Sequence, residues 1–176
     1  MLMKSTIKTF LEILSLRAGP EDLPTSPTLL IRLFVLLIVL QTSLGAWLLA
    51  PAGSLLPQAL LSGLVSLGWL ALVLRLFGKP ERFVQTGSAV LGIACAFAPI
   101  AIPVLVTARP ESGLPVTVTP MTFFAFIISL YLIYVNGRIL RAAIERPLFQ
   151  CVVLFLLGEF FVFALTIALG LGGPNA

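Results

Sequence analysis

The feature that most constrains this chain is a series of five apolar segments, each about as long as a helix that crosses a bilayer. At a rise of about 1.5 Å per residue, about 20 apolar residues span a hydrocarbon core about 30 Å thick. Short links that contain proline, glycine or charged residues separate the segments. The pattern predicts an all-α integral membrane protein whose five-helix transmembrane bundle is formed by residues 28–50, 55–76, 83–107, 116–135 and 147–171.

Composition supports this class and excludes several others. Hydrophobic residues make up 59% of the chain and charged residues 10%, whereas a soluble domain has about 25% charged residues. The chain has no histidine, which excludes histidine-based metal sites and general bases. Cys95 and Cys151 lie within apolar runs, so we expect buried thiols rather than a disulfide. No phosphate-binding loop, nucleophile elbow or paired carboxylate occurs, which favours a non-enzymatic protein without a cofactor.

The distribution of charge predicts the orientation. Lysine and arginine are retained on the cytoplasmic side during insertion, and only Arg109 falls on the opposite side of the predicted spans. We therefore expect a cytoplasmic N-terminus and an exoplasmic C-terminus, with a short exoplasmic tail at 172–176. Because the basic residues flank membrane spans, they indicate a membrane partner rather than nucleic acid. Ten of the eleven share one side: Lys4, Lys8, Arg17, Arg32, Arg75, Lys79, Arg82, Arg138, Arg141 and Arg146.

Residues 1–27 precede the first span and differ from it in character. Ile7, Phe10, Leu11 and Leu14 recur at helical spacing, with charged residues between them. This pattern predicts a short amphipathic helix on the cytoplasmic membrane surface, and packing on the protein's own loops is the alternative. The proline-rich entry segment at 19–24 ends the helix.

The run Phe10-Leu11-Glu12-Ile13-Leu14-Ser15-Leu16-Arg17, continued by Ala18-Gly19-Pro20-Glu21-Asp22-Leu23-Pro24, is similar to the entry segment of short bacterial members of the Yip family. The five-span layout also resembles that family. The resemblance implies a five-helix bundle, a non-enzymatic role and a place in the bacterial inner membrane.

Glu159 is the strongest candidate for a functional residue because it lies near the middle of the fifth segment. A charged side chain there costs at least about 2.5 kcal/mol, so we expect the carboxyl to face the bundle. One interpretation is a proton or cation site. The other is a protonated glutamate hydrogen-bonded across helices to Gln41 or Ser66. Counting to equal depth along the other spans gives its expected neighbours: Gln41, Thr42, Ser43, Ser62, Gly63, Ser66, Cys95 and Thr122.

Two further groups of residues have candidate roles. Ser88, Gly92 and Ala96 recur every four residues and predict a face for close helix packing. The second group is a basic rim that can hold anionic lipid head groups, with a pair between Arg141 and Glu145 on one helix. It consists of Lys79, Arg82, Arg138, Arg141 and Arg146.

Two functions are consistent with these patterns. The first is a role in membrane organisation or assembly, through contacts with lipids, with other membrane proteins or with further copies of the chain. The second is a small transporter, or a subunit of a transport complex, that uses Glu159 as its proton or cation site. The odd number of spans and the lack of an internal repeat favour the first.

Overall fold

The computed structural model describes residues 10, 12–13, 19–48, 55–107 and 120–170, and within these ranges it is helical with no strand. Five of its helices are long and apolar enough to cross a membrane, which confirms the all-α, multi-pass class. Two short 3-10 turns, η1 (Pro20–Asp22) and η2 (Pro80–Arg82), precede α2 and α4. The long helices are α2 (Pro27–Leu48), α3 (Leu55–Leu76), α4 (Phe83–Thr107), α5 (Pro120–Ile144) and α6 (Leu148–Ala168).

The fourth helix extends beyond its predicted end. The apolar run stops at Val135, but α5 continues through Asn136 and Gly137 to Ile144. Its last two turns keep a helical pattern of apolar residues, and Leu140, Ala143 and Ile144 are buried against α3 and α6. The prediction that the helix ends at Val135 was therefore wrong, because helical packing continues after the uninterrupted hydropathy ends.

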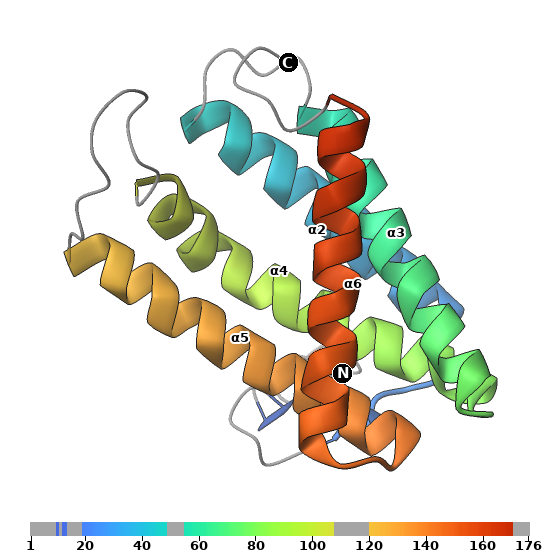
Figure 1. Ribbon diagram of the computed structural model, residues 1–176. Helices are drawn as coiled ribbons and strands as arrows, with labels where there is room; N and C mark the ends of the chain where they lie inside the picture. Colours follow the sequence, from blue (N-terminus) through green and yellow to red (C-terminus); the bar gives the residue numbers. More distant parts are fainter. Residues whose placement is uncertain (1–9, 11, 14–18, 49–54, 108–119, 171–176) are drawn as a thin grey trace.

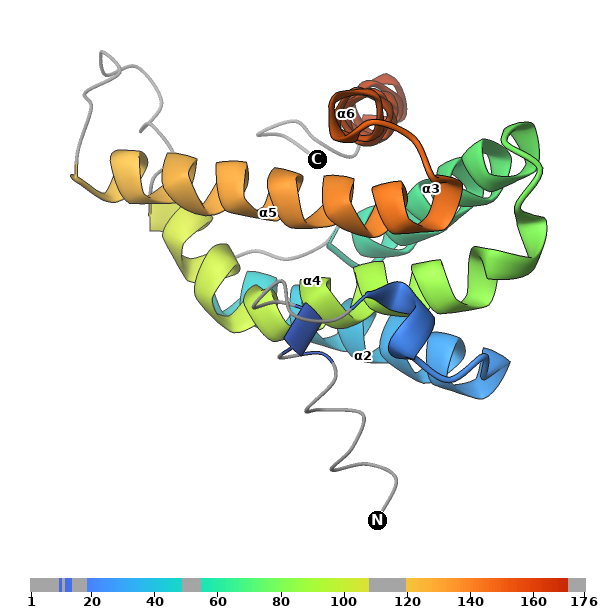
Figure 2. The ribbon, with the colours of Figure 1, turned by 90° about the horizontal axis from the view of Figure 1, so that it is seen from below.

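The five helices form a ring rather than a bundle of parallel rods. The main contacts run from α2 to α4, α5, α6 and α3, and back to α2. Figure 1 shows α2, α4 and α5 running in a similar direction, with α6 crossing in front of them. In the view from below, α5 is seen from the side and α6 almost end-on (Figure 2). α5 and α6 meet where Gly137 faces Val152, and they diverge toward the other end of the molecule.

The described residues that precede α2 pack on the long helices. Ile13 and Leu23 are buried in a cluster with residues of α4 and α5. The ring of Phe10 occupies the space that a side chain at Gly92 would need. Phe10 and Ile13 therefore face the protein, which differs from the predicted contact of Phe10 with the membrane surface. The other residues of the predicted stripe, Ile7, Leu11 and Leu14, lie outside the described residues.

Candidate functional site

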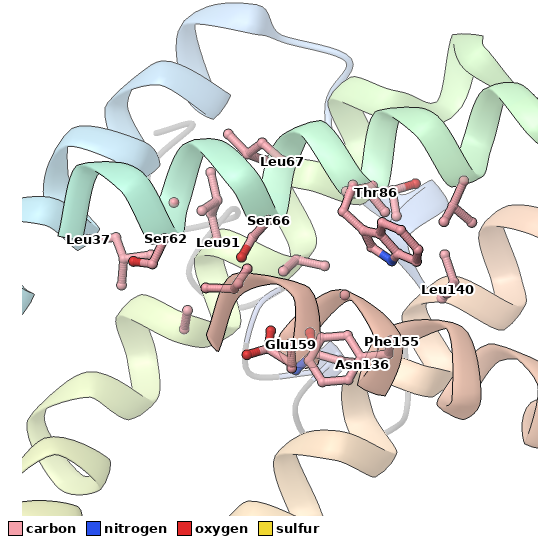
Figure 3. Close-up of a pocket in the computed structure, with 18 of the residues that line it drawn as sticks. Leu37, Ser62, Ser66, Leu67, Thr86, Leu91, Asn136, Leu140, Phe155 and Glu159 are labelled. Carbon is pink, nitrogen blue, oxygen red and sulfur yellow. The ribbon is translucent and has the colours of Figure 1, made fainter. Parts of the chain in front are cut away.

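A cavity of about 230 Å³ lies inside the ring of helices, and all five long helices contribute to its wall. Its lining is mainly apolar, with several polar side chains that face inward. Figure 3 shows Ser62 and Ser66 on α3 and Glu159 on α6, with Asn136 contributed by α5. No lysine or arginine is among the described residues that line it. The geometry is that of a small binding pocket that no basic side chain neutralises.

The three residues predicted to form an intramembrane site line this one cavity. Glu159 is the twelfth of the 21 residues of α6, Gln41 comes from α2, and Ser66 comes from α3. Glu159 is exposed in the isolated chain, so it lies where the cavity is open. Within the described part of the chain, it makes no hydrogen bond to Gln41 or Ser66.

The other expected neighbours of Glu159 divide into two groups. Ser62 and Gly63 line the cavity, as their depth along the second span suggested. Thr42, Ser43, Cys95 and Thr122 are not among the lining residues. Cys95 is buried and directs its thiol to the Leu33 carbonyl oxygen of α2, 3.5 Å away. Equal depth therefore gives the right level in the membrane, but only those residues that also lie on the inward face of their helix line the cavity.

Several polar side chains at the cavity already donate hydrogen bonds to backbone carbonyls. The Trp69 indole N–H donates to the Leu154 oxygen at 3.0 Å, which ties α3 to α6. The Ser62 hydroxyl donates to Ala59 at 3.0 Å, and the Thr86 hydroxyl donates to Arg82 at 2.8 Å. These bonds fix the three side chains and leave the hydroxyl oxygens of Ser62 and Thr86 available as acceptors.

Asn136 is the functional candidate that the sequence reasoning missed. Its side chain is 8% exposed, and its amide nitrogen donates to the Leu132 carbonyl at 2.9 Å. Its Oδ1 atom is buried without a hydrogen-bond partner and belongs to a cavity-lining residue. Because the predicted fourth span ends at Val135, Asn136 lies just outside it. Continuing the helix through residues 136–144 places Asn136 on the inward face of α5.

The predicted packing face on α4 is shorter than expected. Ser88 and Gly92 are buried, but Ala96 is exposed. Four residues correspond to slightly more than one helical turn, so positions spaced by four drift around the helix axis by about 40° per step. By the third position the drift has moved Ala96 away from the face. The close approach at Gly92 is made by Phe10 rather than by another transmembrane helix.

Two residues of the basic rim form ion pairs and hydrogen bonds within the chain. Lys79 and Arg82 both contact Glu145 Oε1, at 3.3 Å and 2.7 Å. Arg82 also donates to the carbonyl oxygens of Ala142 and Ala143, each at 3.0 Å, at the end of α5. The predicted pair between Arg141 and Glu145 is wrong. Glu145 has a φ of 56°, so the helix ends there and the carboxylate turns toward the η2 loop.

The remaining rim residues differ in exposure and in partners. Arg146 lies over the Phe77 ring, with its guanidinium carbon 5.5 Å from the ring centre. Arg138 and Arg141 are exposed on the last turns of α5. These two arginines are therefore the rim positions best placed to meet a lipid head group.

No metal-binding cluster of three or more histidine, cysteine or acidic side chains occurs among the described residues. Comparison with protein-family models, with curated proteins and with solved structures finds no match. The site is therefore interpreted from its own geometry and chemistry.

Proposed function

We propose that this chain is a non-enzymatic multi-pass membrane protein that binds a small polar ligand inside its helical ring, as a small transporter or as a subunit of a transport complex. The observation that carries the proposal is that Glu159, Gln41 and Ser66 come from three helices to one cavity. Ionisable side chains within membrane spans are costly and commonly mark substrate or ion pathways.

The shape of the ring supports the proposal. α5 and α6 contact each other near Gly137 and then diverge, and Glu159 lies on the diverging part of α6. Glu159 lines the cavity and is exposed in the isolated chain, so its carboxyl is accessible from outside the ring. Trp69 and Phe155 add aromatic surface to the wall of the cavity.

The test is whether water reaches the cavity in a membrane. Cys95 and Cys151 are both buried, which gives a low labelling background. In reconstituted protein, Ser66→Cys should react with a membrane-impermeant thiol reagent. Ser129→Cys, on α5 and away from the cavity lining, is the matched control and should react slowly. Equal, slow labelling at both positions would show that the cavity is closed and dry, and would contradict the proposal.

The exposed arginines favour a second candidate function, in membrane organisation through lipid contacts. Arg138 and Arg141 are both exposed and project from one helix at the basic end. Attraction of an anionic membrane is worth about 1 kcal/mol per basic residue. The double variant Arg138→Gln, Arg141→Gln should retain less anionic phospholipid after mild purification, measured by mass spectrometry. Unchanged retention would argue against this role.

The Yip-like resemblance, the cytoplasmic N-terminus and a place in a bacterial inner membrane belong to the same proposal. They are supported by the entry segment and by the ten basic residues on one side of the predicted spans.

A further inference from the structure

Resting on the proposed function, we infer that the ligand of the central cavity is a small monovalent cation, either an alkali-metal ion or a small organic ammonium ion. The inference starts from the hydrogen-bonding capacity of the lining. Glu159, when ionised, offers only acceptors, and no basic side chain among the lining residues balances its charge.

The neutral polar residues of the lining also offer acceptor oxygens to the cavity. Ser62 and Thr86 donate their hydroxyl protons to backbone carbonyls three and four residues earlier in the chain, so their oxygen lone pairs remain available. The Trp69 N–H donates to Leu154 in the same way. Three lining donors are therefore already occupied. The Gln41 amide and the Ser66 hydroxyl can still donate, but each also offers an acceptor oxygen, so the Glu159 carboxylate sets the sign of the charge that the cavity prefers.

Asn136 gives the independent observation that points to a ligand. Its Oδ1 is a buried acceptor with no partner in the described chain. The hydrogen bond from its amide nitrogen to Leu132 determines which way the amide is turned, so the oxygen is the atom left unsatisfied. An unsatisfied buried acceptor is destabilising unless a donor or a cation meets it.

Charge and size together select the ligand class. An anion would meet acceptor oxygens and a carboxylate, which disfavours it. Carboxylate, amide and hydroxyl oxygens are hard ligands, oxygen atoms coordinate Na⁺ in transporters, and the one carboxylate among the described lining residues balances a single positive charge. A cavity of about 230 Å³ also has room for a small ammonium ion. The aromatic faces of Trp69 and Phe155 in its wall would favour such an ion through cation–π attraction.

Tryptophan fluorescence can report binding of this cation. It contains two tryptophans, Trp47 and Trp69, and only Trp69 lines the cavity. A Trp47→Phe background therefore leaves a single indole at the site. The full chain in lipid nanodiscs is titrated with sodium, potassium and methylammonium chloride. N-methylglucamine chloride replaces these salts to keep the ionic strength constant.

We expect a saturable change in Trp69 fluorescence with at least one cation, unchanged when gluconate replaces chloride. Comparison of the alkali-metal titrations with the methylammonium titration shows which class of cation binds. Asn136→Leu and Glu159→Gln should each weaken the response roughly tenfold or more, since each removes one ligand oxygen or the charge. Asn136→Asp keeps an oxygen at that position and should keep binding, which separates loss of the ligand from loss of the fold.

Ser88→Ala is the matched control. Ser88 is also fully buried with an unpartnered hydroxyl, but it does not line the cavity. The inference is overturned if no cation gives a saturable response, or if Asn136→Leu responds like Ser88→Ala. If Ser66→Cys is labelled from water while no cation binds, the cavity takes a neutral ligand and only this inference fails. If Ser66→Cys is not labelled, the proposed function fails with it.

Discussion

The contact between α3 and α6 closes the helical ring, and it depends on a glycine. A Cβ added at Gly158 would lie 2.7 Å from Nε1 and 3.1 Å from Cγ of Trp69. The same indole donates the hydrogen bond to the Leu154 oxygen at 3.0 Å. Gly158→Ala must therefore displace either the Trp69 ring or the α6 backbone, and the hydrogen bond is lost in both cases.

The size of the effect follows from these contacts. Inserting a methyl group into a packed contact costs about 1–3 kcal/mol. Loss of a hydrogen bond between membrane helices adds about 0.6–1.7 kcal/mol. The higher helix propensity of alanine returns about 0.5–1 kcal/mol. We expect Gly158→Ala to lower the free energy of unfolding by about 1–4 kcal/mol.

The measurement is reversible unfolding in mixed micelles, followed by tryptophan fluorescence and circular dichroism. Gly68→Ala is the matched control, because Gly68 lies on the facing helix and a Cβ there would meet nothing within 4 Å. It should be neutral or slightly stabilising. Equal stability of the two variants would refute the conclusion that α6 closes the ring against Trp69.

The remaining predictions concern the two ends of the molecule. Hydrogen bonds from Lys79 and Arg82, followed by their charges, lower the pKa of Glu145. This stabilisation is present above the unfolded value of about 4.3 and is lost as pH falls through the folded pKa. As pH falls through this range, the free energy of unfolding of Glu145→Gln should therefore decrease less than that of the unchanged chain. A reporter fused after Ala176 should be exoplasmic and one inserted within 79–82 cytoplasmic, whereas a cytoplasmic C-terminus would show a miscounted span. Phe10→Ser removes the ring beside Gly92, so protease cleavage within 1–18 should rise; unchanged cleavage would mean that the ring does not hold the segment.

The fold class and part of the site could be predicted from the sequence because hydropathy and depth along a span are local properties. Seven of the ten predicted span starts and ends fall within two residues of the observed helix bounds, including both bounds of α3 and of α4. Depth alone also brought Gln41 and Ser66 to the level of Glu159, and all three line the cavity.

The remaining features depend on tertiary packing. Hydropathy ended the fourth span at Val135, so Asn136 could not be recognised as a buried residue of α5. Spacing alone suggested the Arg141–Glu145 pair, but the left-handed backbone at Glu145 redirects the carboxylate to Lys79 and Arg82. The contact of Phe10 with Gly92 joins residues distant in sequence, which no local pattern reveals.

The most direct test of the central claim, a cation site at Glu159 inside the membrane, is labelling with a lipid-soluble carbodiimide. The reagent reacts with protonated carboxyl groups that it reaches from the apolar phase. Peptide mapping of the reconstituted protein should locate the modification at Glu159, and saturating concentrations of the cation that changes Trp69 fluorescence should protect it. Glu159→Gln should abolish the labelling. Absence of modification at Glu159, or modification that no cation slows, would contradict the claim.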